Sequence, residues 1–348
     1  MRNRQQSLIV HASVTLASVL QTACSGIQNS INPAGPQAER ISHLWWLMFY
    51  VCSAVFVIVM AFTFVAIRNR SNSRKQTDLE QPLLNPPKEA EYRRHYVILG
   101  ATALTCLILF VFLIDSFLVG RSLTAELAHK NGLVIEITGH QWWWEARYLD
   151  SNVSNIFTTA NEIHIPVGVP VTFTLHANDV IHSFWVPNLT GKKDLIPGKV
   201  ATIWLQADRA GVYRGQCAEY CGLQHAHMAF WIIAESQTDF NAWRQNQTQS
   251  SILAATESQR RGQQVFLSAT CVMCHAINGT PAGSNVGPNL THLASRAMIA
   301  AASLTNTKEH LQQWVVNSQA IKPGNKMPQN NLAPDDLQAL TDYLQSLK

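Results

Sequence analysis

Residues 214–228 read RGQCAEYCGLQHAHM and contain many side chains that bind metals. Two cysteines, a glutamate, two histidines and a methionine stand within the twelve positions from Cys217 to Met228, and a further histidine, His182, lies 35 residues before Cys217. Thiolate and imidazole groups bind zinc or copper, and two nearby cysteines can also form a disulfide outside the cytoplasm. The spacing therefore predicts a metal site or a disulfide.

The methionine helps to separate these possibilities. A zinc site could use Cys217, Cys221, His225 and His182, but it would leave the thioether of Met228 without a role. A disulfide between the two cysteines would leave both histidines and the methionine unexplained. Thiolate, imidazole and thioether together form the soft ligand set associated with copper, so the residues favour copper over zinc and over a disulfide.

A second motif, CVMCH, occupies residues 271–275. C-x-x-C-H is typical of covalent c-type haem attachment, with Cys271 and Cys274 bonded to the haem and His275 as an axial ligand of the iron. A redox-active dithiol is the alternative. Met327 follows His275 by 52 residues and is a candidate second axial ligand, and histidine with methionine suits electron transfer.

Two apolar stretches near the N-terminus, 44–67 and 96–119, each contain 24 residues. As helices they would be about 36 Å long, against a hydrocarbon core of roughly 30 Å, so they predict two membrane-spanning helices in a hairpin over residues 40–120. Buried helices of a soluble protein are the alternative. Residues 68–95 carry seven Lys/Arg against four acids, which predicts a cytoplasmic loop and places everything after residue 120 outside.

Three cysteines lie in or before these stretches. Residues 1–24 have two arginines, an apolar run and a final Ala-Cys pair, the pattern of an export signal, and Cys24 is a candidate for lipid attachment. Cys52 and Cys106 lie inside the apolar runs, and we interpret them as small buried hydrophobic residues.

The remaining chain predicts two further domains. Residues 124–240 contain about seven short β-rich runs separated by turn residues, which predicts a Greek-key sandwich or barrel. Residues 241–255 are polar and predict a linker. Residues 256–348 contain helical patterns at 309–317 and 334–347 around the CVMCH motif, so an all-α domain is expected. A net charge of +4 with 14% charged residues and no dense basic patch excludes a nucleic-acid-binding protein.

Three stretches together resemble subunit II of the haem-copper cytochrome c oxidases: GHQWWWEARYLD (139–150), HSFWVPNLTGKKDLIPG (182–198) and GQCAEYCGLQHAHM (215–228). The resemblance implies a cupredoxin-like domain with a dinuclear copper A centre. In that centre Cys217 and Cys221 would bridge both coppers. His182 and His225 would each bind one copper, Met228 would be a weak ligand, and Glu219 would contribute its backbone carbonyl.

The same resemblance implies roles at two surfaces. Trp142 would be the ring at which electrons arrive from cytochrome c, although Trp143 stands where the family more often has tyrosine. The carboxylate of Glu219 would face a magnesium ion at the boundary with oxidase subunit I, with Asp194 a weaker candidate at the same interface.

The CVMCH domain makes the chain similar to oxidases whose subunit II carries its own cytochrome c. That architecture implies a cytochrome c oxidase subunit in a bacterial cell membrane, with both redox domains on the periplasmic side. A cytochrome c donor, soluble or membrane-bound, would reduce haem c, haem c would reduce copper A, and subunit I would reduce oxygen. The net charges, −4 over 124–240 and +2 over 256–348, predict electrostatic docking of the two domains that weakens with salt.

Three other functions fit the residues less well. A copper-handling membrane protein would not need a fused cytochrome. A quinol oxidase subunit would lack the copper ligands, all of which are present here. A nitrous oxide reductase would need a large additional catalytic domain.

Overall fold

The computed structural model describes residues 26–73, 88–125 and 132–348. The chain divides into two compact units, of which Arg40–Ala125 is one and the segments before and after it together form the other. The predicted export signal and Cys24 lie outside the described residues. The β-rich domain and the C-terminal domain therefore belong to the same unit.

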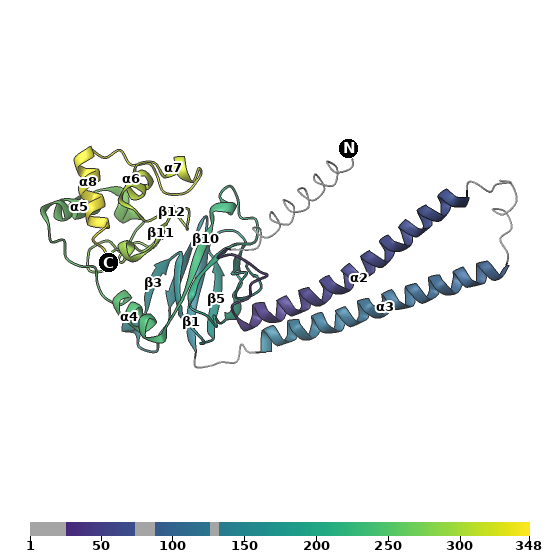
Figure 1. The fold of residues 1–348 in the computed structure, drawn as a ribbon. Helices are drawn as coiled ribbons and strands as arrows, with labels where there is room; N and C mark the ends of the chain where they lie inside the picture. Colours follow the sequence, from purple (N-terminus) through teal and green to yellow (C-terminus); the bar gives the residue numbers. More distant parts are fainter. Residues whose placement is uncertain (1–25, 74–87, 126–131) are drawn as a thin grey trace, which may run out of the picture. The chain divides into compact units, whose positions relative to one another are not determined.

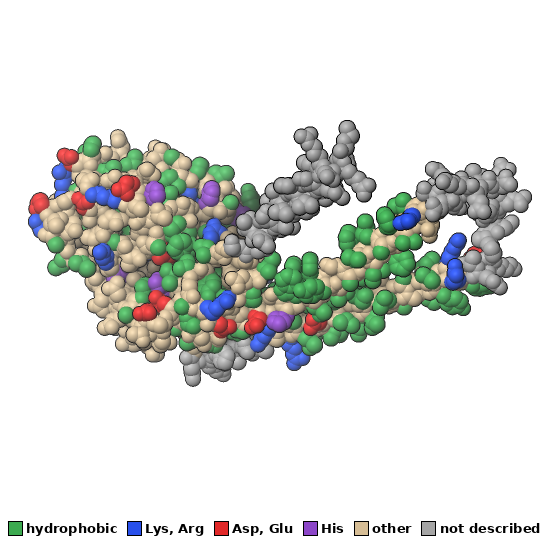
Figure 2. All heavy atoms as spheres, in the orientation of Figure 1, with side chains coloured by type: hydrophobic (Ala, Val, Ile, Leu, Met, Phe, Trp, Pro, Cys, Tyr) green, Lys and Arg blue, Asp and Glu red, His purple; other side chains and the backbone are tan. Residues whose placement is uncertain are grey.

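The first unit consists of two long helices, α2 (Pro36–Ser73) and α3 (Lys88–Ala125), and the first residues of α2 belong to the other unit. Each helix contains one of the predicted spans and is long and apolar enough to cross a membrane. Apolar side chains cover the visible surface of both helices (Figure 2). Cys52 and Cys106 are exposed on these helices, so our interpretation of both as buried was wrong. A two-helix unit has too little interior to cover its apolar residues.

The β domain begins with a five-stranded sheet in the order β3-β2-β1-β5-β8 (Figure 1). Alternate residues of β1 and β5, such as Ile135, Ile137 and Phe173, are fully buried, as expected for strands with one face on a core. β1 pairs with β5 in parallel and with β2 in an antiparallel arrangement. The strand bounds are β1 (Leu133–His140), β2 (Trp143–Tyr148), β3 (Phe157–Ala160), β5 (Val171–Ala177) and β8 (Ala201–Leu205).

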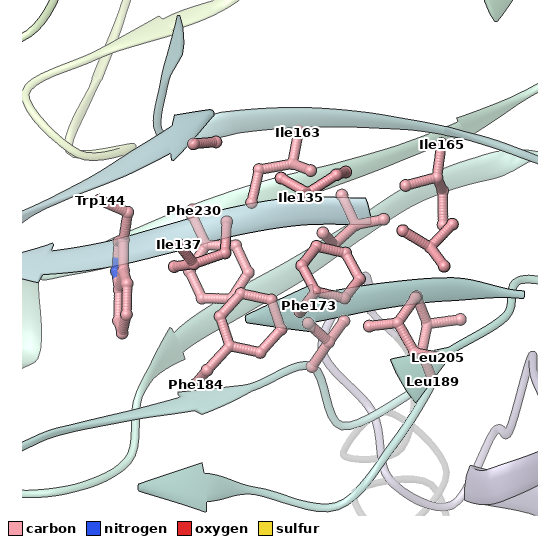
Figure 3. Packing of buried hydrophobic residues seen from close by; sticks show 14 of the residues in the cluster. Ile135, Ile137, Trp144, Ile163, Ile165, Phe173, Phe184, Leu189, Leu205 and Phe230 are labelled. Carbon is pink, nitrogen blue, oxygen red and sulfur yellow. The ribbon is translucent and has the colours of Figure 1, made fainter. Parts of the chain in front are cut away.

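The second sheet has the order β4-β10-β9-β6-β7, and its strands are β4 (Glu162–Pro166), β6 (His182–Trp185), β7 (Lys193–Leu195), β9 (Gly211–Cys217) and β10 (Ala229–Glu235). Side chains of both sheets meet in one apolar core, where Phe173 packs against Phe184 and Phe184 stacks on Phe230 (Figure 3). Each buried aromatic or branched residue contributes roughly 1.5–3 kcal/mol to folding. The predicted two-sheet sandwich is confirmed, and it fixes the strands that carry the copper candidates.

The segment predicted as a linker is partly helical. Helix α4 (Gln237–Gln247) starts at the cap Ser236 and covers the first seven residues of the predicted 241–255 linker. Its Phe240 is buried, and Trp243 stacks on His164 of the β domain. These two aromatic side chains pack the helix against the β domain. The polar composition of the segment gave no indication of this packing.

The C-terminal domain is helical, as predicted. Helices α5 and α8 pack together, and α8 starts with Pro334, with Asp335 and Asp336 in its first turn, as the sequence indicated. Phe266, Leu311 and Tyr343 contribute to a separate apolar core. The elements are α5 (Glu257–Ser268), η4 (Thr270–Met273), η5 (Leu293–Ser295), β11 (Met298–Ile299), β12 (Leu304–Thr305), α6 (Lys308–Val316), α7 (Ser318–Ile321) and α8 (Pro334–Leu344).

Candidate metal centres

The predicted copper ligands converge in the β domain. Cys217 Sγ lies 3.9 Å from His182 Nδ1, and Cys221 Sγ lies 3.6 Å from His225 Nδ1 and 3.8 Å from Met228 Sδ. The ligand atoms of His182, Cys217 and Cys221 all lie within 4.8 Å of one another, which is close enough for a shared metal site.

The fold explains this convergence. His182 is the first residue of β6, Cys217 is the last residue of β9, and the two strands are paired. The other three ligands lie on the short connection from β9 to β10, which contains the 3₁₀ turn η3 (His225–His227). Cys217 N donates to Met228 O and closes this connection into a loop. A strand end and a closed loop therefore hold all five side chains together.

The donor set fits copper A. Cys217, Cys221, Met228 and His182 are buried, and both cysteines are free thiols. The carbonyl oxygen of Glu219 also points into the cluster and lies 3.1 Å from Cys217 Sγ. The thiol of Cys221 donates to Cys217 and lowers the pKa of Cys217, while the same bond raises that of Cys221. Cys217 is thereby poised as a thiolate, the form that binds metal.

Asp179, which the sequence analysis missed, fixes the orientation of His182. Its Oδ1 lies 2.8 Å from His182 Nε2, so this nitrogen donates to the carboxylate and Nδ1 is left to face Cys217. Burial opposes ionisation, but hydrogen bonds from His182, Gln141 N and Val180 N lower the pKa of Asp179. A carboxylate three residues before a predicted histidine ligand is the signal that could have identified it.

The magnesium candidates lie near each other and share a lysine. Glu219 Oε2 is 3.4 Å and Asp194 Oδ1 is 3.6 Å from Lys192 Nζ, and Ser183 Oγ also donates to Asp194. The two carboxylates are partly exposed and converge on one cation. A bound divalent ion at this position would compete with the ammonium group.

Trp142 touches the copper loop but is not a surface ring in this chain. Its Nε1 donates to Cys221 O at 3.0 Å, and Gln141 Nε2 donates to the same carbonyl at 2.9 Å. Only 9% of Trp142 is exposed, so the ring does not lie on the surface of this chain, and its role in accepting electrons stays a prediction. The reason lies in the C-terminal domain, where Gly324 comes close enough that an added Cβ would be 3.9 Å from the indole.

The haem attachment motif is held by its own backbone and by a neighbouring loop. Cys274 N and His275 N donate to Cys271 O, so both cysteines and the histidine follow one tight turn. His275 Nδ1 lies 2.7 Å from Pro288 O, and donation to this carbonyl leaves Nε2 free to bind iron. At Gly287 an added Cβ would lie 2.8 Å from the imidazole, so glycine is required there. VGPNL (286–290) thus forms the support of His275.

Met327 is held by hydrogen bonds on both sides of its backbone. Its nitrogen donates to Asn325 Oδ1, and its carbonyl accepts from Ser318 Oγ and Gln319 Nε2. The side chain packs against the apolar core of the C-terminal domain. A thioether fixed in an apolar environment fits the role of an axial iron ligand.

A half-buried cation near His275, with a buried Nε atom, also fits a haem. Arg296 donates to Asn289 O, next to Pro288, and lies close enough that its charge contributes to lowering the pKa of His275, for which burial is the main cause. Its Nε has no hydrogen-bond partner among the described residues. Because haem carries two carboxylates, an unpaired buried guanidinium nitrogen suits this group.

The chain combines a β-sandwich that contains a buried Cys-His-Met cluster with a helical domain that contains a C-x-x-C-H motif. This combination defines a class of redox proteins in which a cupredoxin-like copper domain is joined to a cytochrome c domain. Residues 133–236 match the family described as cytochrome c oxidase subunit II, periplasmic domain, and residues 259–348 match the cytochrome c family. Both matches cover the domains that carry the clustered ligands.

Relatives of similar length give the particular family. The chain is 35% identical to cytochrome c oxidase subunit 2 of Alkalihalophilus pseudofirmus and 27% identical to that of Bacillus subtilis, in each case over 96% of both chains. The crystal structure of the periplasmic domain of subunit II of cytochrome oxidase from Bradyrhizobium japonicum is 31% identical, with a TM-score of 0.31, over 33% of this chain and 92% of that one. The chain belongs to the cytochrome c oxidase subunit 2 family, and it carries a fused cytochrome c domain.

Proposed function

We propose that this subunit collects single electrons at its C-terminal domain and delivers them through its β domain to the rest of the oxidase. When bound, haem c and copper A supply two one-electron centres between a cytochrome c donor and subunit I, where oxygen is reduced to water. The observation that carries the proposal is that the clustered ligands His182, Cys217 and Cys221 lie in the same compact unit as the CVMCH motif of residues 271–275.

In the β domain we propose that Cys217 and Cys221 would bind the coppers through their sulfur atoms and that His182 and His225 would each bind one copper. Met228 and the Glu219 carbonyl complete the set. The site is buried on strand ends and a closed loop, which limits movement of the ligands when the charge changes. No open coordination position is needed, because the site passes electrons and does not bind oxygen.

In the C-terminal domain we assign Cys271 and Cys274 as the covalent haem attachments, with His275 and Met327 as the axial ligands. The bond from His275 to Pro288 O sets the orientation of the imidazole, and the bonds around Met327 hold the backbone of the residue that would be the second ligand. Histidine with methionine gives a closed iron site suited to electron transfer. Trp142 lies between the two domains and is assigned as the route to Cys221.

The remaining assignments concern the surroundings. We propose that α2 and α3 span the cell membrane with the loop over residues 68–95 on the cytoplasmic side, so that both redox domains lie in the periplasm. We also propose that Glu219, with Asp194, holds magnesium at the subunit I boundary. The two carboxylates lie close to the same point, and a magnesium ion there would have to displace the ammonium group of Lys192, which pairs with both.

Optical and electron paramagnetic resonance spectra of the purified full-length chain test the proposal. We expect a low-spin haem c spectrum together with a mixed-valence signal from two coppers. Cys217→Ser should abolish the copper signal and preserve the haem spectrum, whereas His275→Ala should disturb only the haem. A protein that held zinc, or a disulfide between Cys217 and Cys221, would contradict the proposal.

A further inference from the structure

A buried lysine joins the two redox domains. Lys322, at the end of α7, is 3% exposed. Its Nζ donates to Trp142 O at 2.8 Å and to His227 O at 2.9 Å in the β domain, and to Ala300 O at 3.3 Å in its own domain. An ammonium group has three N–H donors, and three carbonyls receive them. One of these carbonyls, that of His227, belongs to the copper loop, and another belongs to Trp142, whose indole donates to that loop.

Removing the ammonium group of Lys322 from water costs free energy, and its contacts must offset that cost. Loss of hydration lowers the pKa of Lys322 to about 7. A buried charge without good partners destabilises a protein, whereas carbonyl groups that satisfy every donor offset much of that cost. Such arrangements can define a unique geometry between two packed surfaces. The three carbonyls therefore specify one docked position of the C-terminal domain.

Lys322 is rigidly connected to the haem ligand Met327. The side chain of Asn325 donates through Nδ2 to Lys322 O and Ser318 O, and its Oδ1 accepts from Met327 N. Gly324, with a φ of 81°, allows the turn between them, in the left-handed region that glycine enters without strain. The position of Lys322 thus determines where the axial-ligand loop lies.

The residues of the β domain that contact the Lys322 segment also contact the copper loop. Trp142 accepts the lysine at its carbonyl and donates from its indole to Cys221 O. Gln224 Nε2, also on the copper loop, donates to Pro323 O at 2.9 Å. The loop that carries Met327 is therefore seated on the residues that surround Cys221.

The third carbonyl comes from a strained segment. Ala300, Ala301 and Ala302 have φ values of 54°, 55° and 58°, in the left-handed region that costs an alanine about 1–2 kcal/mol per residue. Strained backbone persists only where its surroundings hold it in place. The bond from Lys322 to Ala300 O is one such restraint, and it orients the turn between β11 and β12.

We propose that Lys322 is the positioning residue that holds the Met327 loop against Trp142, so that electrons cross between the two domains in one fixed geometry. The inference rests on the electron path proposed above. It also means that a cytochrome c donor must act on the C-terminal domain, because that domain already covers Trp142.

The test compares Lys322→Met with Lys199→Met in the purified oxidase. Methionine keeps much of the side-chain length and removes all three donors, and Lys199 is an exposed lysine of the β domain. After flash reduction of haem c, electron transfer to copper A should slow at least about tenfold in Lys322→Met, since small displacements of reacting groups can cost a factor of 100. Lys199→Met should retain the original rate. Both variants should keep both metal spectra, and an unchanged rate in Lys322→Met would overturn the inference.

A second measurement needs no substitution at Lys322. When the assembled oxidase is treated with an amine-reactive reagent, we expect Lys199 to be labelled readily and Lys322 to be protected, as mass spectrometry of the digested subunit can measure. Equal labelling would show that the docked position does not form. If the unaltered oxidase passed no electron from haem c to copper A, the proposed function itself would fail. Slowing confined to Lys322→Met supports the positioning role.

Discussion

At the scale of single residues, Asp179 decides which nitrogen of His182 faces the sulfur atoms. Its carboxylate accepts from Nε2, and it is itself held by Gln141 N and Val180 N. A neutral imidazole has one donor and one acceptor nitrogen, so this bond leaves Nδ1 as the acceptor. The imidazole of His182 is therefore already oriented for metal binding by the protein's own contacts.

We expect Asp179→Ala to weaken copper binding by about 10- to 100-fold, the usual effect of losing a partner of a metal-bound histidine. Asp208→Ala is the matched control, because Asp208 accepts from Gln206 in the same domain without contacting a ligand. Copper content after dialysis against a chelator measures the effect. Equal copper retention in the two variants would contradict the role given to Asp179.

His140 should make the β domain sensitive to acid. Its ring stacks on Trp143 at 4.2 Å, and burial lowers its pKa to about 4 from an ordinary value of 6.5, despite the opposing charge of Asp179. Between pH 6.5 and 4 the imidazole is therefore protonated in the unfolded chain and neutral in the folded chain. As the pH decreases through this range, the free energy of unfolding decreases by up to about 1.4 kcal/mol per pH unit.

His140→Phe keeps an aromatic ring at this position and removes the titrating group. Thermal unfolding measured at pH 7 and pH 5 should show a smaller loss of stability on acidification in the variant than in the unaltered chain. If both proteins lost the same amount, His140 would not be the source of the acid sensitivity.

At the scale of elements, the C-terminal domain depends on the contact between α5 and α8. Helix α5 starts with a capping box in which Thr256 and Gln259 exchange hydrogen bonds. Gly262 then faces α8 so closely that an added Cβ would lie 1.9 Å from Ala339 O and 2.8 Å from the Cβ of Tyr343. Only a residue without a side chain allows this approach of the two helices.

Gly262→Ala should therefore destabilise the C-terminal domain by about 1–3 kcal/mol or more, the usual cost of overpacking. We expect a lower yield of haem-containing protein and a lower unfolding midpoint of the haem spectrum. Gly283→Ala is the control, because an added Cβ there has no atom within 4 Å. A Gly262→Ala protein as stable as the control would show that α5 and α8 can separate without loss.

At the scale of the whole chain, two kinds of contact hold the β domain and the C-terminal domain together: buried hydrogen bonds and an ion pair. Buried hydrogen bonds from Lys322 and to Glu162, which accepts from Met298 N at 2.7 Å, join the two domains. A pair with one exposed partner, Lys326 with the largely covered Asp179 at 3.4 Å, also crosses the interface. Exposed pairs contribute at most about 1 kcal/mol and are screened by salt, whereas buried contacts are not.

Electron transfer from haem c to copper A should therefore slow only modestly as ionic strength rises, by less than the effect of Lys322→Met. Lys326→Met should reduce that salt dependence, because it removes an exposed charge that takes part in docking. Flash photolysis at 20 mM and 500 mM salt, roughly spanning Debye lengths of about 20 to 4 Å, measures both effects. If Lys326→Met left the salt dependence of the rate unchanged, the charge of Lys326 would not contribute to docking.

The sequence by itself determined the chemistry. Ligand types and short spacings, as in residues 217–228 and 271–275, are local properties, because residues a few positions apart on one loop stay close in any fold. The same holds for the long apolar helices and for the start of α8 at Pro334. The pattern of about seven β-rich runs also identified the β-sandwich, whose two sheets contain ten strands in the described residues. Strands as short as β7, with three residues, show too little alternation to be recognised from the sequence.

Only the tertiary structure decided what lies around that chemistry. Pairing of β6 with β9 brings His182 to Cys217, while Gly262 and Lys322 acquire their roles from partners far away in the chain. Trp142 is covered because a loop 180 residues later packs against it. Such contacts depend on how two domains fit together, and the free energy of that fit comes from burial and hydrogen bonding between surfaces that no local pattern encodes.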